Sequence, residues 1–543
     1  SIMQKNYKFS SFSVFDVLQN DGCYTSQSRY LFSLGSDKLK SVTGYVANSS
    51  PHTKDSQTRH FAIVMKDLKN VTVDGNGSRV LLTDKGSFAY LENCENVTLK
   101  NFTFDIETPC CPEFTVMKTG LTSANVQFAP NTRVEKIDDS TFDIKCGNTK
   151  IAVDGKGITY MRALDADRNA VFTIGKDPAD IFSKVTKLDI LSDDGVNQTV
   201  KLSFKSLCPL KNGYSYSYRT NIRDEAGFVF DNCKNVTLDS CNVKYMHTQG
   251  IVAQFCENVT IEKLDVRPKT SQSVACTGNV FDFFECSGTV SVKNSYFCGC
   301  LGKIVNMGAQ YARINGRLDD HTLACAYANA KYYGIPFCKR GDVLAVTETE
   351  SLTAYGRYKA VKCAVDKINP DLFNVTFEGE VPQDAVGKVL ENESANGADL
   401  IFENNTLYDV PNKAVCINSA GNHTLRFNNF KKVTKSAIYI GGDAKTDFVA
   451  GRVGNIAIAE NRFSDCNSPI ICVDPTVPEN VCDFAESVSI SDNYFTESEK
   501  TLYDIKHTRE VEFDSKNVCD DEKYVGSTAF CLSSKIKDYE IRY

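Results

Sequence analysis

Cysteine is the residue type whose chemistry stands out first, because 22 Cys are scattered through the 543 residues, from Cys23 to Cys531. They form no CxxC pair and no Cys/His cluster, so we expect neither a metal nor a cofactor. Many unclustered cysteines favour disulfides and an oxidising compartment. We expect disulfides mainly in the irregular segments, where they would close short loops. The candidate pairs are Cys325 with Cys338, Cys466 with Cys472 or Cys482, and Cys519 with Cys531.

Asparagine in N-x-S/T sequons offers a second covalent modification, the attachment of N-glycans. Twelve sequons and the many cysteines together predict a secreted protein, extracellular or at a cell surface. The chain starts at Ser1 without an apolar leader, so we expect that a signal peptide has been removed. Glycans should occupy the sequons of irregular segments more fully than the sequons within the repeated strands described next. The sequons lie at Asn48, Asn70, Asn76, Asn96, Asn101, Asn197, Asn235, Asn258, Asn374, Asn392, Asn404 and Asn422.

A repeated strand pattern must position these residues. Segments that alternate apolar and polar residues return roughly every 20 to 30 residues, each beginning with Asn or a similar turn residue. Short strands at this spacing, with no helical periodicity between them, predict an all-β solenoid, a parallel β-helix. An Asn that starts a rung can adopt a left-handed turn and stack on its neighbours as a ladder. Examples are NVTVDGN from Asn70, NVTLKN from Asn96, NVTLDS from Asn235 and NVTIEK from Asn258.

Four cysteines share the register of the repeat. Cys94, Cys233, Cys256 and Cys286 each lie two residues before the turn residue that starts a rung. Adjacent strands are about 4.8 Å apart, but parallel Cβ vectors disfavour a disulfide between them. We therefore expect a buried stack of thiols.

Two long stretches lose the repeat and contain irregular strands with Gly turns. Both are too long for loops, and each is expected to be a small β-barrel packed on the solenoid. The expected organisation is an N-terminal segment with the first rungs in 1–107, a first barrel in 108–222, central rungs in 223–312, a second barrel in 313–381, and C-terminal rungs with a terminal strand in 382–543.

The composition excludes several classes of protein. With 42% hydrophobic and 24% charged residues the chain resembles an average folded domain. A formal charge of -7 gives no global attraction to nucleic acid or anionic lipid. No apolar run reaches the roughly 18 residues of a membrane helix.

The order of several motifs resembles glycoside hydrolase family 110. These motifs are NVTLKNFTFD at 96–105, YMHTQGIVAQFCENVTI at 245–261, CSGTVSVKNSYFCG at 286–299 and GGDAKTDFVAGRVGNIAIAENRF at 441–463. The resemblance covers about Tyr30 to Asn517. It implies an inverting exo-α-galactosidase built as a right-handed parallel β-helix with two small barrels. Inversion requires an acid and a base on opposite faces of the sugar.

The positions of this chain that match the family's catalytic carboxylates do not hold carboxylates. Asn279 stands where the resemblance implies an aspartate, Gly302 and Lys303 stand in place of an aspartate pair, and Val449 replaces a glutamate. An amide or an ammonium cannot take over the acid and base roles of those carboxylates. The resemblance therefore implies a catalytically degenerate relative.

Three retained residues resemble pocket positions of the family and are candidate binding residues: Asp105, His247 and Asn306. Their simpler interpretation is that they are polar groups bonded to neighbouring rungs. The chain also has no Trp, which sugar sites often use for stacking.

These observations favour a non-catalytic secreted glycoprotein that serves as a structural subunit of an extracellular filament, coat or matrix. Its partners would be its own copies, joined head to tail through the alternating C-terminal strand at Tyr539, Ile541 and Tyr543, and covalent N-glycans. One alternative is a protein that binds extracellular carbohydrate. Another is an active exo-α-galactosidase with relocated acids, for which Asp282 and Glu285 are the candidates.

Overall fold

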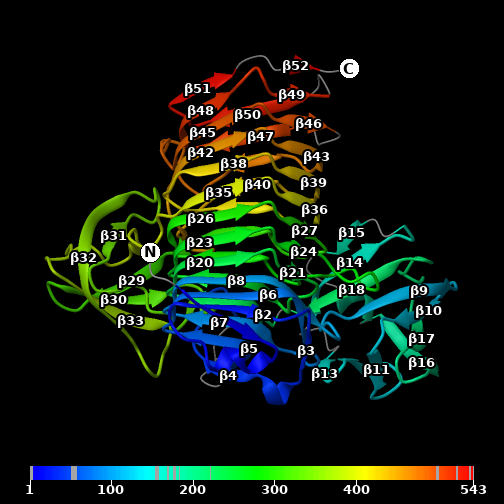
Figure 1. Ribbon diagram of the computed structural model, residues 1–543. Helices are drawn as coiled ribbons and strands as arrows, with labels where there is room; N and C mark the ends of the chain where they lie inside the picture. Colours follow the sequence, from blue (N-terminus) through cyan, green and yellow to red (C-terminus); the bar gives the residue numbers. More distant parts are fainter. Residues whose placement is uncertain are drawn as a thin grey trace.

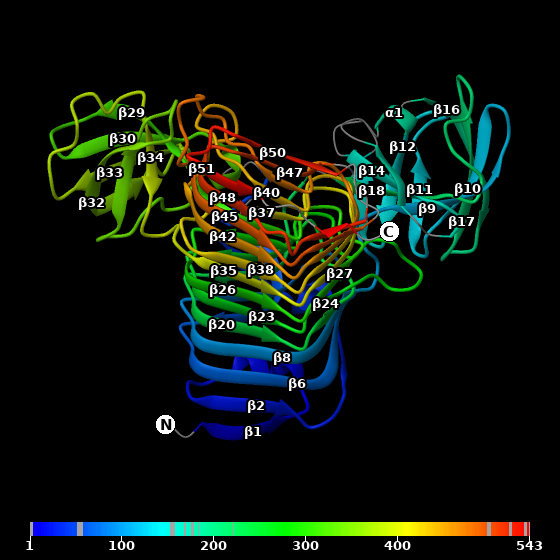
Figure 2. The ribbon, with the colours of Figure 1, turned by 90° about the horizontal axis from the view of Figure 1, so that it is seen from above.

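The computed structural model describes residues 4–50, 58–152, 158–167, 170–174, 179–182, 184–220, 222–496, 501–520, 524–536 and 540–541. Its body is a parallel β-helix whose rungs stack along one axis, as expected from the repeats (Figure 1). Two β inserts flank this solenoid, one on each side, as the view from above also shows (Figure 2). The predicted fold class is therefore confirmed.

Two long sheets form the solenoid. The 23-stranded sheet contains β1 (Lys5–Phe9), β2 (Gly22–Ser26), β3 (Leu31–Leu34), β6 (Lys69–Leu82), β8 (Glu95–Ile106), β20 (Lys234–Asp239), β21 (Asn242–Val243), β23 (Glu257–Glu262), β24 (Asp265–Val266), β26 (Ser287–Lys293), β27 (Tyr296–Cys298), β35 (Asp399–Glu403), β36 (Thr406–Val410), β38 (His423–Arg426), β39 (Asn429–Val433), β42 (Val453–Ala459), β43 (Arg462–Cys466), β45 (Ala485–Ser491), β46 (Tyr494–Thr496), β48 (Thr508–Phe513), β49 (Val518–Cys519), β51 (Ser533–Ile536) and β52 (Glu540–Ile541). The 13-stranded sheet contains β4 (Lys40–Thr43), β5 (Thr58–Lys66), β7 (Ser87–Glu92), β19 (Ala226–Asp231), β22 (Gln249–Gln254), β25 (Phe281–Phe284), β28 (Val305–Gln310), β37 (Val415–Ile417), β40 (Ile438–Ile440), β41 (Val449–Ala450), β44 (Ile471–Val473), β47 (Thr501–Lys506) and β50 (Val525–Ala529).

The period-two pattern places one apolar residue of each rung above the next. Val71, Val97, Val236, Val259 and Val290 are in register on successive strands of the larger sheet. All five are buried in the solenoid core. Burial of such columns is the main stabilisation of a solenoid, because each rung contacts only its neighbours.

Asparagine ladders run along the solenoid, as predicted. Asn96 and Asn235 have φ of 54° and 53°, and each donates through Nδ2 to Oδ1 of the Asn one rung before it, at 2.8 and 2.7 Å. A second, buried ladder was not expected from the sequence. It joins Asn405, Asn428, Asn461, Asn493 and Asn517, whose side chains also donate to backbone carbonyls.

The cysteines are all unbonded to one another. The expected thiol stack is present in part, since Cys94 and Cys233 are buried and the backbone N–H of Cys94 donates to Sγ of Cys233 at 3.4 Å. The short-loop disulfides proposed for Cys325, Cys338, Cys466, Cys472, Cys482, Cys519 and Cys531 are not formed. One reason is that neighbours in sequence face different ways: Cys466 lies in the solenoid core, whereas Cys472 lies outside that core.

The first insert was expected to be a barrel, but its described residues form two antiparallel sheets around their own core, and neither sheet closes on itself. Its strands are β9 (Glu113–Thr119), β10 (Ser123–Phe128), β11 (Thr132–Lys136), β12 (Phe142–Cys146), β13 (Thr149–Ala152), β14 (Ile158–Leu164), β15 (Ala170–Ile174), β16 (Val185–Asp193), β17 (Gln198–Phe204) and β18 (Ser215–Thr220), with one short helix, α1 (Ala179–Phe182).

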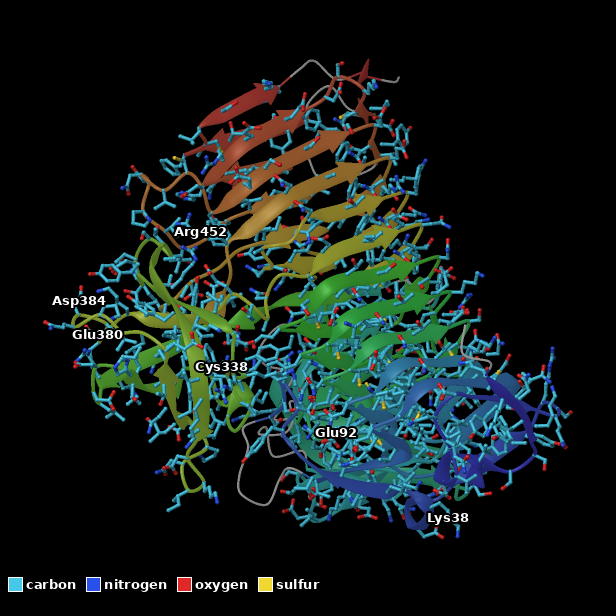
Figure 3. All side chains as sticks on the ribbon, turned by 60° about the vertical axis from the view of Figure 1, so that its left-hand side comes forward. Lys38, Glu92, Cys338, Glu380, Asp384 and Arg452 are labelled. Carbon is cyan, nitrogen blue, oxygen red and sulfur yellow. The ribbon has the colours of Figure 1, made fainter. Side chains whose placement is uncertain are left out.

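The second insert is a closed six-stranded barrel. It consists of β29 (Ala312–Arg317), β30 (Thr322–Tyr327), β31 (Val343–Thr347), β32 (Ala354–Val365), β33 (Leu372–Phe377) and β34 (Val389–Asn392). Its closing strand β34 pairs with β29 and β31, so the barrel extends past the expected boundary at 381. Arg452 of the solenoid joins the two parts, since its guanidinium donates to the carbonyls of Leu352 and Asp483 at 2.9 Å (Figure 3).

The C-terminal strand pairs with its own solenoid. In β52, Glu540 and Ile541 are in parallel register with Val518 and Cys519 of β49. Tyr539 and Tyr543, the other residues of the expected strand, lie outside the described residues. Within the described part of the chain, no helix is both long and apolar enough to cross a membrane.

Candidate functional site

A polar cavity of about 270 Å³ lies where the 13-stranded sheet, the first insert and the barrel meet. Its floor is formed by β25 and β28, on which Asp282 and Asn306 occupy adjacent positions in parallel register. The first insert contributes Arg219 from the end of β18, and the barrel contributes Lys331 and Tyr332. This size is close to the lower limit of typical small-molecule sites, about 300 Å³.

Asp282 is the central carboxylate of the cavity, and only 2% of its surface is exposed. Its Oδ1 accepts hydrogen bonds from the side-chain amides of Asn48, Asn279 and Asn306, at 2.9, 2.8 and 2.9 Å. Its Oδ2 is buried and has no hydrogen-bond partner among the described residues. Three amides thus fix the carboxylate, while the hydrogen-bonding capacity of its second oxygen is unused among the described residues.

Asp447 is the second carboxylate that lines the cavity, and it is exposed. Asp443 orders the loop before it, because Oδ1 of Asp443 accepts the backbone N–H groups of Lys445, at 2.8 Å, and of Thr446 and Asp447. This turn places Asp447 at the cavity, where its negative charge acts on the ammonium group of Lys331.

The positions that the resemblance assigned to catalysis do line this cavity. Oδ1 of Asn279 accepts the backbone N–H of Lys303 at 3.1 Å, and Nζ of Lys303 donates to Oδ1 of Asn306 at 2.7 Å. Gly302 and Val449 also line the wall. A Cβ on Gly302 would lie 2.3 Å from the carbonyl group of Gly278, so the backbone here has no room for a side chain.

Glu285, the expected partner of Asp282, is not in this cavity. It lines a separate cavity of about 400 Å³ with Asp231 and Asp342, beside Cys338 at the base of the barrel (Figure 3). Burial, and then the negative charge of Asp342, raises the pKa of Glu285 well above its ordinary value. The pairing of Asp282 with Glu285 as relocated acids is therefore wrong, and Asp447 is the carboxylate that shares the site with Asp282.

Two of the three retained candidates also lie elsewhere. Asp105 is fully buried, where it pairs with Arg79 and with Lys269 at 3.2 Å. His247 is buried beside Tyr245, and burial lowers its pKa. Neither lines the cavity, which agrees with the simpler interpretation of these residues; only Asn306 does.

Two sequons also have a different role from the expected one. Asn48 is 7% exposed, and its Nδ2 donates to Asp282. Asn392 is buried, and its Nδ2 donates to the carbonyl of Phe337 at 3.0 Å. A glycan needs an accessible Nδ2, so neither side chain is placed to carry one in the folded protein.

Tyr332 and Phe284 form the aromatic side of the cavity. Their rings are stacked with centroids 4.9 Å apart, and both line the site. Tyrosine and phenylalanine thus supply the apolar surface for which the chain has no Trp. Within the described ranges, no group of His, Cys, Asp and Glu is arranged to hold a metal ion.

Comparisons with known proteins bear on this site. The chain matches no family model. It is 23% identical to alpha-1,3-galactosidase A of Bacteroides thetaiotaomicron, over 86% of this chain and 80% of the relative. It is 25% identical to alpha-1,3-galactosidase A of Streptomyces avermitilis, over 88% of this chain and 79% of that relative. Alpha-1,3-galactosidase B of Bacteroides thetaiotaomicron is 23% identical, over 87% and 77%.

The chain is similar to α-1,3-galactosidases over most of its length. This confirms the resemblance drawn from the motifs; catalytic degeneracy stays a prediction. Among solved structures, the exopolygalacturonase of Thermotoga maritima aligns with this chain at a TM-score of 0.39 and 8% identity. The alignment covers 97% of this chain and 83% of the exopolygalacturonase chain. The adhesin PfbA of Streptococcus pneumoniae covers 98% and 85% at a TM-score of 0.35 and 10% identity.

The expected function, a non-catalytic structural subunit of a filament, coat or matrix, is wrong. The similar proteins are named for a glycosidase activity. The terminal strand that would have joined copies is paired, at Glu540 and Ile541, within its own solenoid. The substitutions at Asn279, Gly302, Lys303 and Val449 do not describe the whole site, because the cavity that they line still contains two carboxylates, Asp282 and Asp447.

Proposed function

We propose that this chain is a glycoside hydrolase that removes a terminal α-linked galactose-type sugar. The observation that carries the proposal is Asp282: a buried carboxylate that lines a cavity of sugar-ring size, is oriented by three amides and has one oxygen, Oδ2, without a hydrogen-bond partner among the described residues. Fixed polar groups around one reactive oxygen are what catalytic preorganisation requires. The α-galactoside class comes from the names of the similar proteins.

We assign the two carboxylates to the two roles of an inverting reaction. Such a reaction uses one carboxyl group to protonate the leaving oxygen and one carboxylate to activate water on the opposite face of the sugar. The leaving group of an exo-acting enzyme points to the mouth of its pocket, where the exposed Asp447 lies. Asp447 therefore takes the acid role, and the buried Asp282 takes the base role. Tyr332, which is stacked on Phe284, lines the apolar side of the cavity against which the sugar would pack.

The test is galactose release from an α-1,3-linked galactobioside, with the anomer of the first product read by NMR. We expect β-galactose as the first product, and losses of about 10²- to 10⁴-fold in kcat for Asp282→Asn and for Asp447→Asn. Glu285→Gln is the matched control, since Glu285 lines the other cavity and its loss should leave kcat unchanged. Full activity in Asp282→Asn would disprove the proposal.

Sugar binding without hydrolysis is the second candidate. It is favoured by Asn279, Gly302 and Lys303, which replace the expected carboxylates and line the same cavity. Titration calorimetry with galactobiose would then give binding, while the anomer assay gives no product. Under either function, the sequons motivate the proposal that the chain acts outside the cell.

A further inference from the structure

The cavity carries more positive than negative side chains. Arg219, Arg223, Lys303 and Lys331 line it, whereas Asp282 and Asp447 are its only acidic residues in the described part of the chain. A neutral hexose offers hydroxyl groups, which neutral amides and carboxylates bind well. Four cations around one sugar site therefore need a separate explanation.

Three of these cations have no carboxylate partner among the described ion pairs. Nη1 of Arg223 donates to the carbonyl and side-chain oxygens of Asn48, which are neutral acceptors. Lys303 donates to the amide oxygen of Asn306. The side chain of Lys331 has no hydrogen bond or ion pair in the described structure, although the lysine is half-buried.

The position of Lys331 is fixed by the backbone. It lies on the short 3-10 helix η3 (Ala330–Tyr332), whose N-cap Asn329 accepts the backbone N–H of Lys331 at 3.1 Å. Next to it, Tyr332 packs on Phe284. Burial, and then the positive charge of Arg223, lowers the pKa of Lys331 from its ordinary value, although the negative charges of Asp282 and Asp447 act in the opposite direction. An anion placed between these two cations would relieve both the desolvation and the repulsion.

We infer that the sugar bound in this cavity carries an anionic group, a carboxylate or a sulfate ester, held by Lys331 and Arg223. The inference rests on the proposed function, since it names the substrate class of the same site. Arg recognises carboxylate and sulfate oxygens through paired N–H donors, and Lys adds a point charge. Asp282 and Asp447 keep their roles at the glycosidic bond.

The experiment compares substrates that differ in one group. 4-Nitrophenyl α-D-galactoside, the corresponding galacturonide and the 6-sulfated galactoside are assayed for kcat/KM, at low and at high salt. We expect the galacturonide or the sulfated sugar to be preferred at least tenfold, and the one preferred identifies the anion. The preference should shrink at high salt, because salt screens the attraction between charges. Equal or better turnover of the neutral galactoside would overturn the inference but not the proposed function.

Two lysine variants test whether Lys331 causes the preference for the anionic substrate. Lys331→Met should reduce the preference for the anionic substrate roughly 10- to 100-fold, the value of one charge-assisted hydrogen bond. Lys445→Met is the control, because Lys445 is exposed, pairs with Glu350 and does not line the cavity. An unchanged preference in Lys331→Met would overturn the assignment.

Binding separates the two proposals. Calorimetry with free galacturonate, free galactose 6-sulfate and free galactose measures recognition without turnover. If either anionic sugar binds better than galactose and Lys331→Met removes the difference, the inference stands even when no glycoside is hydrolysed, and only the hydrolase proposal fails. If galactose binds as well as both anionic sugars, the inference fails.

Discussion

Replacing Asp282 by Asn separates a catalytic from a structural role of this carboxylate. The substitution keeps the size of the side chain and an oxygen at the Oδ1 position. That oxygen can still accept from Asn48, Asn279 and Asn306, while the new NH2 group replaces Oδ2, which has no partner in the described structure. The fold should therefore tolerate the change much better than the chemistry does.

The magnitudes follow from these contacts. A hydrogen bond to a charged group contributes about 1.5–3 kcal/mol, and one between neutral groups about 0.5–1.5 kcal/mol. Three weakened bonds would cost about 3 kcal/mol, and removal of a charge that is 2% exposed offsets part of this. We expect the free energy of unfolding of Asp282→Asn to fall by about 1–3 kcal/mol. Turnover should fall by about 10²- to 10⁴-fold, since an amide is not a base.

The assay is kcat on the best glycoside, with denaturant unfolding measured on the same preparation. Asp282→Ala serves as comparison, because it leaves three amide donors without an acceptor. Each unsatisfied donor should lower the free energy of unfolding by about 1–3 kcal/mol, so Asp282→Ala should be clearly less stable than Asp282→Asn. The reasoning is refuted if Asp282→Asn retains more than a tenth of the turnover, or if Ala and Asn are equally stable.

The remaining predictions concern stability and modification. Asn461→Ala should lower the free energy of unfolding by about 2–4 kcal/mol in urea titrations, because it interrupts the buried ladder, whereas Asn455→Ala in an exposed ladder should cost less than about 1 kcal/mol. Burial raises the pKa of Glu391 to about 7 from 4.5, so the folded protein holds a proton that the unfolded chain releases, and stability falls as pH rises between these values. Glu391→Gln should therefore gain about 3 kcal/mol above pH 7 and nothing below pH 4, measured by unfolding at each pH. Glycopeptide mass spectrometry should find glycans on the exposed Asn374 and none on the buried Asn48.

The repeats carried enough information to predict the solenoid, because each rung repeats the same local requirements. An apolar residue at every second position must point into the core, and a turn residue must adopt positive φ, as Asn96 and Asn235 do. The inserts have no such redundancy. The barrel is closed by β34, which pairs with strands far from it in sequence, so its end at Asn392 could not be located from the strand pattern of 313–381 alone.

The site was predicted only as far as it lies on the rungs. Asn279 and Asp282 belong to the repeat, and the register that aligns Asp282 with Asn306 follows from it. Asp447 and Lys331 come from a loop and from the barrel, where no period links sequence position to place in space. Asp282 lies on β25, whereas Glu285 follows the last residue of that strand in a turn with a φ of 49°, so the period of two along a strand does not relate their directions. The turn separates the two carboxylates: Asp282 lines the cavity with Asp447, and Glu285 lines the cavity beside Cys338 of the barrel.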